Sequence, residues 1–309
     1  MTVESGSVAD TAGGTADAVP PASGRVVVRA PSRGEAQRKD LRRLLAEALD
    51  RRRVGVIPLR GAIGGAMRTQ ETLRILDRAR KDANIRAVLL DIDSPGGSAT
   101  ASEALFMAVR RLASAKPVVA WIRGVGASGS YFAACGATTI GAFPSAIVGS
   151  VGVISVRPVA FEALRKIGLS VAVTKTGEFK DLGAPWREPT DEDRERDRRL
   201  VDKIFARFTA AVATARHFDE AKMQGITTGE VWLGEEALGM GLVDQLFENE
   251  DDALGEARRL AGLPPHVRPV RMATRRTLAQ RLGLPGASLR GSGAAWLVEM
   301  ESWLSLPHP

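Results

Sequence analysis

The sequence is poor in the two residue types that most often build metal and redox sites. It has one cysteine, Cys135, and three histidines, His217, His266 and His308, in 309 residues. A single cysteine can form neither a disulfide within the chain nor a cysteine cage for zinc. Any chemistry that needs an imidazole therefore has three candidates.

Long apolar runs are also missing. No stretch reaches the roughly 18 consecutive apolar residues of a membrane-spanning helix. The first residues, MTVESGSVADTAGG, have neither a basic start nor an apolar run, so we expect no secretory signal peptide. We expect a cytoplasmic protein that touches a membrane at most peripherally. Aromatic residues make up only 5% of the chain, so its core must consist of Val, Leu, Ile and Ala.

The net charge of +7 is concentrated at the two ends of the chain. Residues 263–298 contain six arginines and no acidic residue. Such a segment can bind anionic lipid at a membrane surface, or it can be a solvated tail. We favour the tail and expect no nucleic-acid partner, because aromatic residues between the arginines and a nucleic-acid-binding motif are both missing.

Short apolar runs alternate with segments of helical periodicity from residue 54 onward. The expected strands are 54–59, 87–92, 117–122, 146–155 and 171–174, and the expected helices include 69–81, 102–113 and 191–216. Strands that are apolar at every position are typical of a sheet covered on both faces. The sequence therefore predicts an α/β fold.

Composition divides the chain into three parts. Residues 1–53 are expected to be a disordered extension, rich in small residues, followed by a short helix from about 35 to 53. Residues 54–250 form the expected α/β domain, and residues 251–309 a basic, weakly structured tail with a short helix near 294–304.

Two glycine-rich turns each follow an expected strand. The first is DSPGGS at 93–98, and the second is GVGASGSY at 124–131, which contains Ser128. Consecutive glycines can present backbone N–H groups to a phosphate or to a developing oxyanion. The first turn lacks the Gly-Lys-Ser/Thr ending of a P-loop. Taken alone, the second turn is explained by tight helix packing, but a serine on one turn and amide donors on the other suit acyl transfer.

A third turn, KTGEFKDLGAP at 175–185, carries Lys180. The chain has only eight lysines against 35 arginines. Arginine stays charged at every accessible pH, whereas a buried lysine can lose its proton and act as a base. For Lys180 on its own, a charged surface side chain remains the alternative.

These stretches resemble the signal peptide peptidase A family, also called protease IV, which are serine peptidases of the Clp/crotonase superfamily. The resemblance runs from about 54 to 249. It rests on DSPGG at 93–97, ASG at 127–129, GSVGVIS at 149–155, GEFKD at 177–181 and WLGEEALGMGLVDQL at 232–246. It implies a fold of repeated β-β-α units with a long C-terminal helical segment.

The resemblance also implies roles for individual residues. Ser128 would be the nucleophile and Lys180 the general base, with oxyanion-hole amides from Gly97 and Gly129. Gly96, Ser98 and Ala99 would border the substrate, an extended apolar peptide such as a signal-peptide remnant. The segment 98–100 would pair with it by strand addition. No metal or organic cofactor is implied. One departure is Ser130, where the family usually has a second glycine.

A Ser/Lys pair fits this chain better than a Ser/His/Asp triad. Clp peptidases have a histidine about 25 residues after the serine, but the corresponding segment here, 149–154, contains none. A lysine base must have its pKa lowered from about 10.4 to roughly 7–8. We therefore expect Asp181 to point away from Lys180, as neighbours do in an extended chain.

The family assembles into homo-oligomeric rings whose sites combine the serine and lysine of neighbouring subunits, so we expect an isolated monomer to be inactive. The apolar side of the 191–216 helix is a candidate interface. Two other functions remain open. One is a crotonase-type acyl-CoA enzyme, in which the same amides polarise a thioester, and the other is a non-catalytic ring-forming scaffold.

Overall fold

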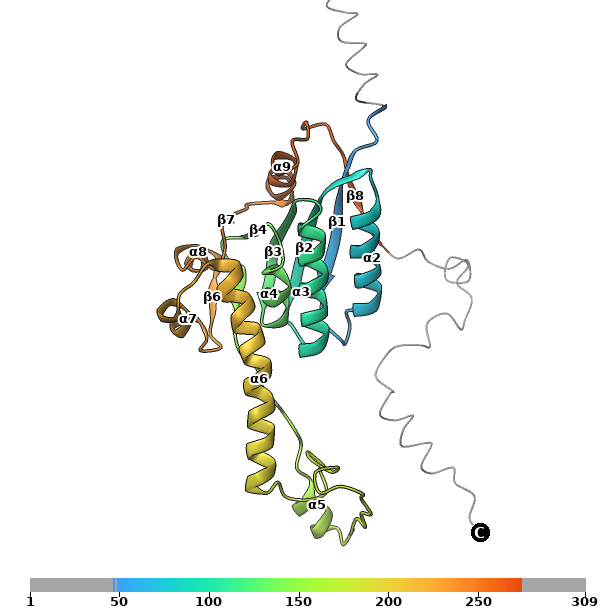
Figure 1. Cartoon of the computed structure of the whole chain (residues 1–309), viewed down its shortest axis with the longest axis vertical. Helices are drawn as coiled ribbons and strands as arrows, with labels where there is room; N and C mark the ends of the chain where they lie inside the picture. The colour runs from blue at the N-terminus through green and yellow to red at the C-terminus, as the bar shows by residue number, and fades with distance from the viewer. Residues whose placement is uncertain (1–46, 48, 274–309) are drawn as a thin grey trace, which may run out of the picture. The chain divides into compact units, whose positions relative to one another are not determined.

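The computed structural model describes residue 47 and residues 49–273 (Figure 1). It contains one eight-stranded sheet with the strand order β6-β5-β3-β2-β1-β8, while β4 pairs with β3 and with β7. The strands are β1 (Arg53–Arg60), β2 (Ile85–Ser94), β3 (Val118–Ala127), β4 (Thr139–Ala142), β5 (Ile147–Gly149), β6 (Val231–Leu233), β7 (Gln245–Leu246) and β8 (Pro269–Arg271). All pairs are parallel except β5 with β6. The structure thus confirms the α/β class.

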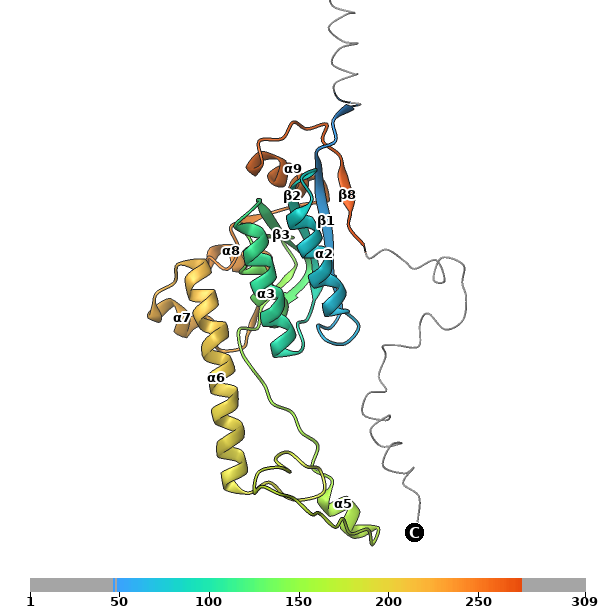
Figure 2. The ribbon, with the colours of Figure 1, turned by 45° about the vertical axis from the view of Figure 1, so that its right-hand side comes forward.

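Helices cover both faces of this sheet. The described residues contain the helices α2 (Thr69–Lys81), α3 (Ala99–Ala113), α4 (Gly129–Ala134), α5 (Phe161–Lys166), α6 (Asp191–Arg216), α7 (Glu220–Ile226), α8 (Gly234–Gly239) and α9 (Glu250–Leu260). Of these, α5 buries no residue and lies away from the sheet, at the start of α6 (Figure 1). Helices α2, α3 and α4 pack on one face together with part of α6, and α9 packs on the other (Figure 1 and Figure 2).

The two covered faces explain why the strands are apolar without interruption. Along β2, Val88 and Leu90 belong to the core beneath α2 and α3, whereas Ala87 and Leu89 belong to the core beneath α9. Successive side chains of a strand point to opposite faces, so a sheet buried on both sides needs an apolar residue at every position.

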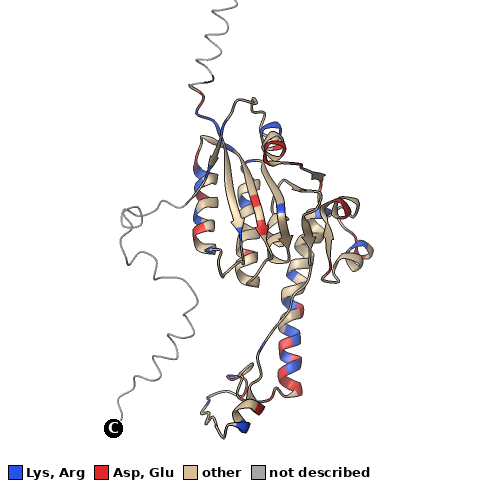
Figure 3. Cartoon of the chain, turned by 180° about the vertical axis from the view of Figure 1, so that it is seen from behind, with Lys and Arg blue, Asp and Glu red and all other residues tan. Residues whose placement is uncertain are grey.

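The long helix α6 begins at a capping box. The Thr190 side chain accepts a hydrogen bond from the Asp193 amide, and the Asp193 carboxylate accepts one from the Thr190 amide. Its first half alternates basic and acidic residues, as the blue and red segments in Figure 3 show. Phe208 and Val212 in its second half are buried in the core, while Leu200 is 51% exposed. Only the second half therefore packs on the sheet domain.

Two expected strands differ from the structure. Of 146–155, only Ile147–Gly149 is a strand, and 171–174 is not a strand at all. Val171 and Val173 are each 45% exposed. A strand needs a hydrogen-bonded neighbour as well as apolar residues, and residues 171–174 have none within the described part of the chain.

The segment from residue 251, expected to be weakly structured, begins with regular elements. Helix α9 supplies Ala253, Leu254 and Ala257 to the core, and β8 pairs with β1 at the edge of the sheet. Sequence patterning missed these elements because α9 buries only Ala253, Leu254 and Ala257, too few for a clear apolar period, and β8 has only three residues. The expected disordered stretch 1–35, most of the helix at 35–53 and the helix near 294–304 lie outside the described residues.

The chain divides into two units, 1–49 and 50–309, and every strand and helix named above lies in the second. Among the described helices, none combines the length and the apolar character needed to cross a bilayer.

Candidate active site

The two glycine turns meet at the carboxyl ends of β2 and β3, which pair in parallel. The Asp93 carboxylate accepts a hydrogen bond of 3.2 Å from the Val125 amide. The buried Ser130 hydroxyl lies within hydrogen-bond distance of the Ser94 and Ala127 carbonyls, at 2.6 and 2.8 Å. Ser130, which stands where the family usually has glycine, therefore connects the two turns.

Ser128 occupies a strained position between β3 and α4. Its backbone has φ 51° and ψ −122°, a conformation that non-glycine residues rarely adopt. Its amide donates to the Gly149 carbonyl at 2.8 Å, and its carbonyl accepts from the Phe132 amide at 2.9 Å. The backbone is thus fixed on both sides, and the half-buried side chain projects from a sharp strand-to-helix turn.

The amides of Gly97 and Gly129 lie next to this serine. A Cβ on Gly129 would lie 3.5 Å from the Gly97 nitrogen, and one on Gly96 would lie 2.6 Å from the Gly129 nitrogen and 3.0 Å from the Ser128 Cβ. Within the described residues, no carbonyl or side chain accepts a hydrogen bond from either amide. Two free N–H groups beside a hydroxyl are the donors that an oxyanion hole requires.

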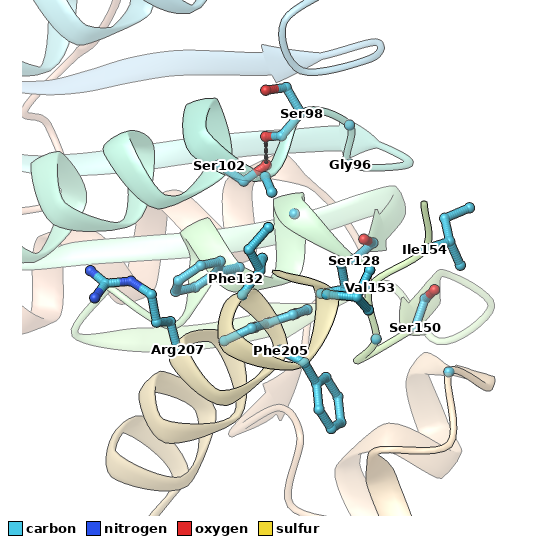
Figure 4. Close-up of a pocket in the computed structure, with 18 of the residues that line it drawn as sticks. Gly96, Ser98, Ser102, Ser128, Phe132, Ser150, Val153, Ile154, Phe205 and Arg207 are labelled. Atoms are coloured by element: carbon cyan, nitrogen blue, oxygen red, sulfur yellow. Dashed lines mark hydrogen bonds between the residues drawn. The ribbon is translucent and has the colours of Figure 1, made fainter. Parts of the chain in front are cut away.

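Ser128 and the two glycines with free amides, Gly97 and Gly129, line a cavity of about 1110 Å³. Its lining includes each residue that the sequence predicted for the serine side of the site, namely Gly96, Gly97, Ser98, Ala99, Ser128 and Gly129. Figure 4 shows Ser128 in this cavity together with Phe132 of α4 and with Phe205 and Arg207 of α6.

The walls of the cavity were not predicted. Val153 and Ile154 line it from the segment after β5, and Ile204, Phe205 and Phe208 line it from α6. The sequence shows an apolar side on this helix, but periodicity does not distinguish a side that packs in a core or interface from one that borders a cleft.

Lys180 lies elsewhere. It is exposed, and it lines a second pocket of about 420 Å³ together with Val173, Thr174 and Trp186. The large cavity does not include it. A single chain therefore does not bring the two residues of the expected Ser/Lys pair into one site.

Asp181 forms ion pairs with residues other than Lys180, and the extended chain that was expected around it is not found. Its carboxylate binds Lys175 at 2.9 Å and Arg187 at 3.0 Å. Residues 178–183 form successive turns rather than an extended chain. Hydrogen bonds from Arg187 and Lys175 lower the pKa of Asp181 to about 2.

The other candidate groups lie outside the cavity. No histidine of the described residues lines it; His217 ends α6 in a left-handed conformation. Cys135 is buried, and desolvation raises its thiol pKa to about 12, so it stays protonated. Among the described residues there is no cluster of three or more His, Cys, Asp or Glu side chains able to hold a metal ion.

Comparisons with known proteins agree with the sequence motifs. The model of peptidase family S49 matches residues 110–264. A relative from Methanocaldococcus jannaschii is 36% identical over 62% of this chain and 61% of its own length, and one from Synechocystis sp. is 33% identical over 70% and 76%. The chloroplastic serine protease SPPA of Arabidopsis thaliana is 30% identical over 65% of this chain and 30% of its own length.

The match thus spans less than two thirds of the length of two of these relatives, 61% of the Methanocaldococcus jannaschii protein and 30% of the Arabidopsis thaliana protein. Among solved structures, a 1510-N membrane-bound stomatin-specific protease superposes with a TM-score of 0.43 and 18% identity over 73% of this chain and 95% of that one. That likeness is too low to add to the fold described above. The sequence matches, which extend over half of the chain and over three quarters of the Synechocystis relative, are sufficient: this chain belongs to peptidase family S49, the family of signal peptide peptidase A and protease IV.

Proposed function

We propose that this protein is a serine peptidase in which Ser128 is the nucleophile and Lys180 the general base. The observation that carries the proposal is the strained Ser128 turn, with the unbonded amides of Gly97 and Gly129 beside it. A non-glycine residue is held at positive φ only where the surrounding structure imposes it, and such positions gather at active sites.

The chemistry follows from these groups. The Ser128 hydroxyl attacks the peptide carbonyl while Lys180 accepts its proton, and the Gly97 and Gly129 amides stabilise the oxyanion. The tetrahedral intermediate then expels the amine, which takes the proton from Lys180. Water activated by Lys180 hydrolyses the remaining ester and restores the Ser128 hydroxyl.

Lys180 would come from a neighbouring copy of the chain in a homo-oligomeric ring. The segment that carries it exposes several large aliphatic side chains; these are Ile167, at 74%, Leu169, at 55%, and Val171 and Val173, each at 45%. Exposed apolar residues grouped in this way are typical of a protein interface. Burial there would remove water from the Lys180 side chain, and loss of water disfavours a charged ammonium relative to the neutral amine that a base requires.

The substrates would be extended apolar peptides, including signal-peptide remnants. Phenylalanine and aliphatic side chains line the cavity, so it suits apolar residues of a peptide. Strand addition at 98–100 is less suited to this geometry, because the Ser98 amide already donates to Ile63 and Ala99 begins α3. Val153 and Ile154, whose backbone groups have no partner in the described residues, are better placed to pair with the peptide.

The proposed domain, about 54–250, is of the Clp/crotonase type and is joined to a long helical segment. Its first strands alternate singly with helices, in the order β1-α2-β2-α3-β3-α4, and only β4 and β5 follow one another before a helix, so a β-β-α unit occurs once rather than repeatedly in the described residues.

Peptide hydrolysis measured from pH 6 to 10 tests the function. Replacing Ser128→Ala or Lys180→Ala is expected to lower kcat/KM by at least about 10³-fold, since each removes a group that forms or breaks a bond. Lys203→Ala, on the exposed side of α6, is the matched control and should retain activity.

A fluorophosphonate probe separates the alternatives. Covalent labelling that disappears in Ser128→Ala supports the peptidase. An unlabelled protein that binds acyl-CoA would favour the crotonase-type enzyme, and a protein inactive in every assay, with Ser128→Ala leaving cellular phenotypes unchanged, would favour the scaffold.

A further inference from the structure

The charged residues that follow Lys180 form one connected cluster. The Arg187 guanidinium donates to both oxygens of Asp181, through Nε at 3.0 Å and Nη2 at 3.1 Å. The same guanidinium binds both oxygens of Asp193, one of them through Nη2 at 3.1 Å. Two bidentate carboxylates on one arginine hold their backbones in a defined relative position.

The cluster attaches the Lys180 turn to α6. Asp193 is the third residue of that helix and closes its capping box with Thr190. A second contact supports the first, because the Arg196 guanidinium of α6 lies 3.4 Å from the centre of the Phe179 ring. Asp181 and Phe179 flank Lys180 in the chain, so both neighbours of the lysine are fixed to the same helix.

The charges of the cluster also cancel. Arg187 and Lys175 carry two positive charges, and Asp181 and Asp193 carry two negative ones. The side chains of Asp181 and Asp193 are only 8% and 6% exposed, so water screens their charges poorly. An unpaired carboxylate at Asp181 would favour the ammonium form of the adjacent lysine.

We propose that Arg187 is a positioning residue for the general base: it fixes the Lys180 turn on α6 and neutralises the carboxylate of Asp181. This inference rests on the proposed function, in which Lys180 must be neutral to act. Further charged groups near the turn are Glu178 in the turn itself, Arg196 on α6, and Arg157, which lies against Gly183 of the turn and pairs with Asp197 of α6 at 2.6 Å.

Variants at the two ends of the bidentate Arg187–Asp181 contact, called the fork below, should shift the pH dependence of activity in opposite directions. Arg187→Gln leaves an unbalanced negative charge beside the proposed base, which favours the charged form of a neighbouring amine and moves the acidic limb of kcat/KM to higher pH. Asp181→Asn leaves an unbalanced positive charge and moves that limb to lower pH. Each shift should be about one pH unit. If Arg187 had a purely structural role, both variants would lose activity, but their acidic limbs would not move in opposite directions.

The experiment compares assembled wild type with Arg187→Gln, Asp181→Asn and Arg187→Lys, from pH 6 to 10. Arg187→Lys keeps the charge but loses the fork, so its limb should stay in place while kcat falls at least threefold. Arg194→Gln is the matched control, because it removes the same charge from the first turn of α6, where Arg194 pairs with the exposed Asp191.

The outcomes separate this inference from the function on which it rests. The role of Arg187 would be overturned if the acidic limbs of Arg187→Gln and Asp181→Asn coincided with that of wild type. It would also be overturned if Arg194→Gln moved the limb as far as Arg187→Gln does. The peptidase would remain established if Ser128→Ala and Lys180→Ala abolish activity. Wild-type activity that persists in Lys180→Ala would overturn the function itself. Circular dichroism and sedimentation confirm that each variant is folded and assembled, and Asp181→Asn keeps the test open should Arg187→Gln fail to fold.

Discussion

At the scale of single residues, the backbone of the first glycine turn, beside Ser128, is held by close contacts. Gly97 has φ 148°, and a Cβ there would lie 2.2 Å from the Ile63 carbonyl oxygen. The Ile63 amide donates to the Gly96 carbonyl at 2.7 Å, and the Ser98 amide donates to the Ile63 carbonyl at 2.9 Å. The first glycine turn is therefore held against the 61–67 loop on both sides of Gly97.

Gly97→Ala is accordingly expected to destabilise the protein by about 2 kcal/mol or more, because it combines a disfavoured φ with a backbone clash. It should also lower kcat, since it displaces the amide that we propose as an oxyanion donor. Chemical denaturation and peptide hydrolysis measure the two effects. Gly225→Ala is the control, because nothing lies within 4 Å of a Cβ at that position. Equal stability of the two variants would contradict this account of the turn.

Residue chemistry could be predicted from the sequence where it depends on the local chain. The glycine-rich turns after apolar strands indicated amide donors near a serine, and the resemblance to the peptidase family assigned the individual roles to Gly97, Gly129 and Ser128. The bond from Ser130 to Ser94 could not be predicted, because it joins turns that are 36 residues apart in the chain. The phenylalanines of the cavity wall are equally a product of tertiary packing.

At the scale of elements, the bounds of α2 and α6 were predicted correctly, since their apolar spacing and, for α6, its capping residues are local features. The expected strand at 171–174 was wrong because composition does not reveal whether a strand has a neighbour. Its exposed valines become understandable if a second copy covers them, which no pattern within one chain can indicate.

The turn at 176–187 should also be sensitive to acid. Arg187 and Lys175 lower the pKa of Asp181 from 3.8 to about 2. A carboxylate whose pKa is lower in the folded state adds stability above its unfolded pKa, and this stability is lost as pH falls toward the folded value. The contacts of the turn with α6 should therefore weaken between about pH 4 and pH 2.

Trp186 lies within this segment and lines its pocket, so its fluorescence can report the change. The signal is obtained as the difference between wild type and Trp186→Phe across pH 6 to 2. A transition between pH 4 and pH 2 that is absent from Arg187→Gln is expected. A difference signal that stays constant down to pH 2 would show that the cluster does not hold the turn.

At the scale of the whole molecule, the separation of Ser128 from Lys180 is the central fact. One copy of the chain places Ser128 in the large cavity and Lys180 in a different, exposed pocket. An active site made by two copies reconciles this geometry with membership of family S49. The exposed side chains of Ile167 and Leu169 provide apolar area for the contact. We expect Ile167→Asp to yield inactive monomers by sedimentation, whereas Leu238→Asp, at a residue 39% exposed on α8, should stay assembled and active.

Complementation tests the shared site directly. Ser128→Ala and Lys180→Ala chains, each inactive alone, are co-expressed with different affinity tags, and mixed assemblies are purified through both tags. If neighbouring copies supply the two groups, some interfaces pair an intact serine with an intact lysine, and partial hydrolysis returns. The fluorophosphonate probe should then label only the Lys180→Ala chain, which carries the intact serine. If both groups came from the same chain, no site in the mixture would be complete, so mixed assemblies without any hydrolysis would exclude a site shared between copies.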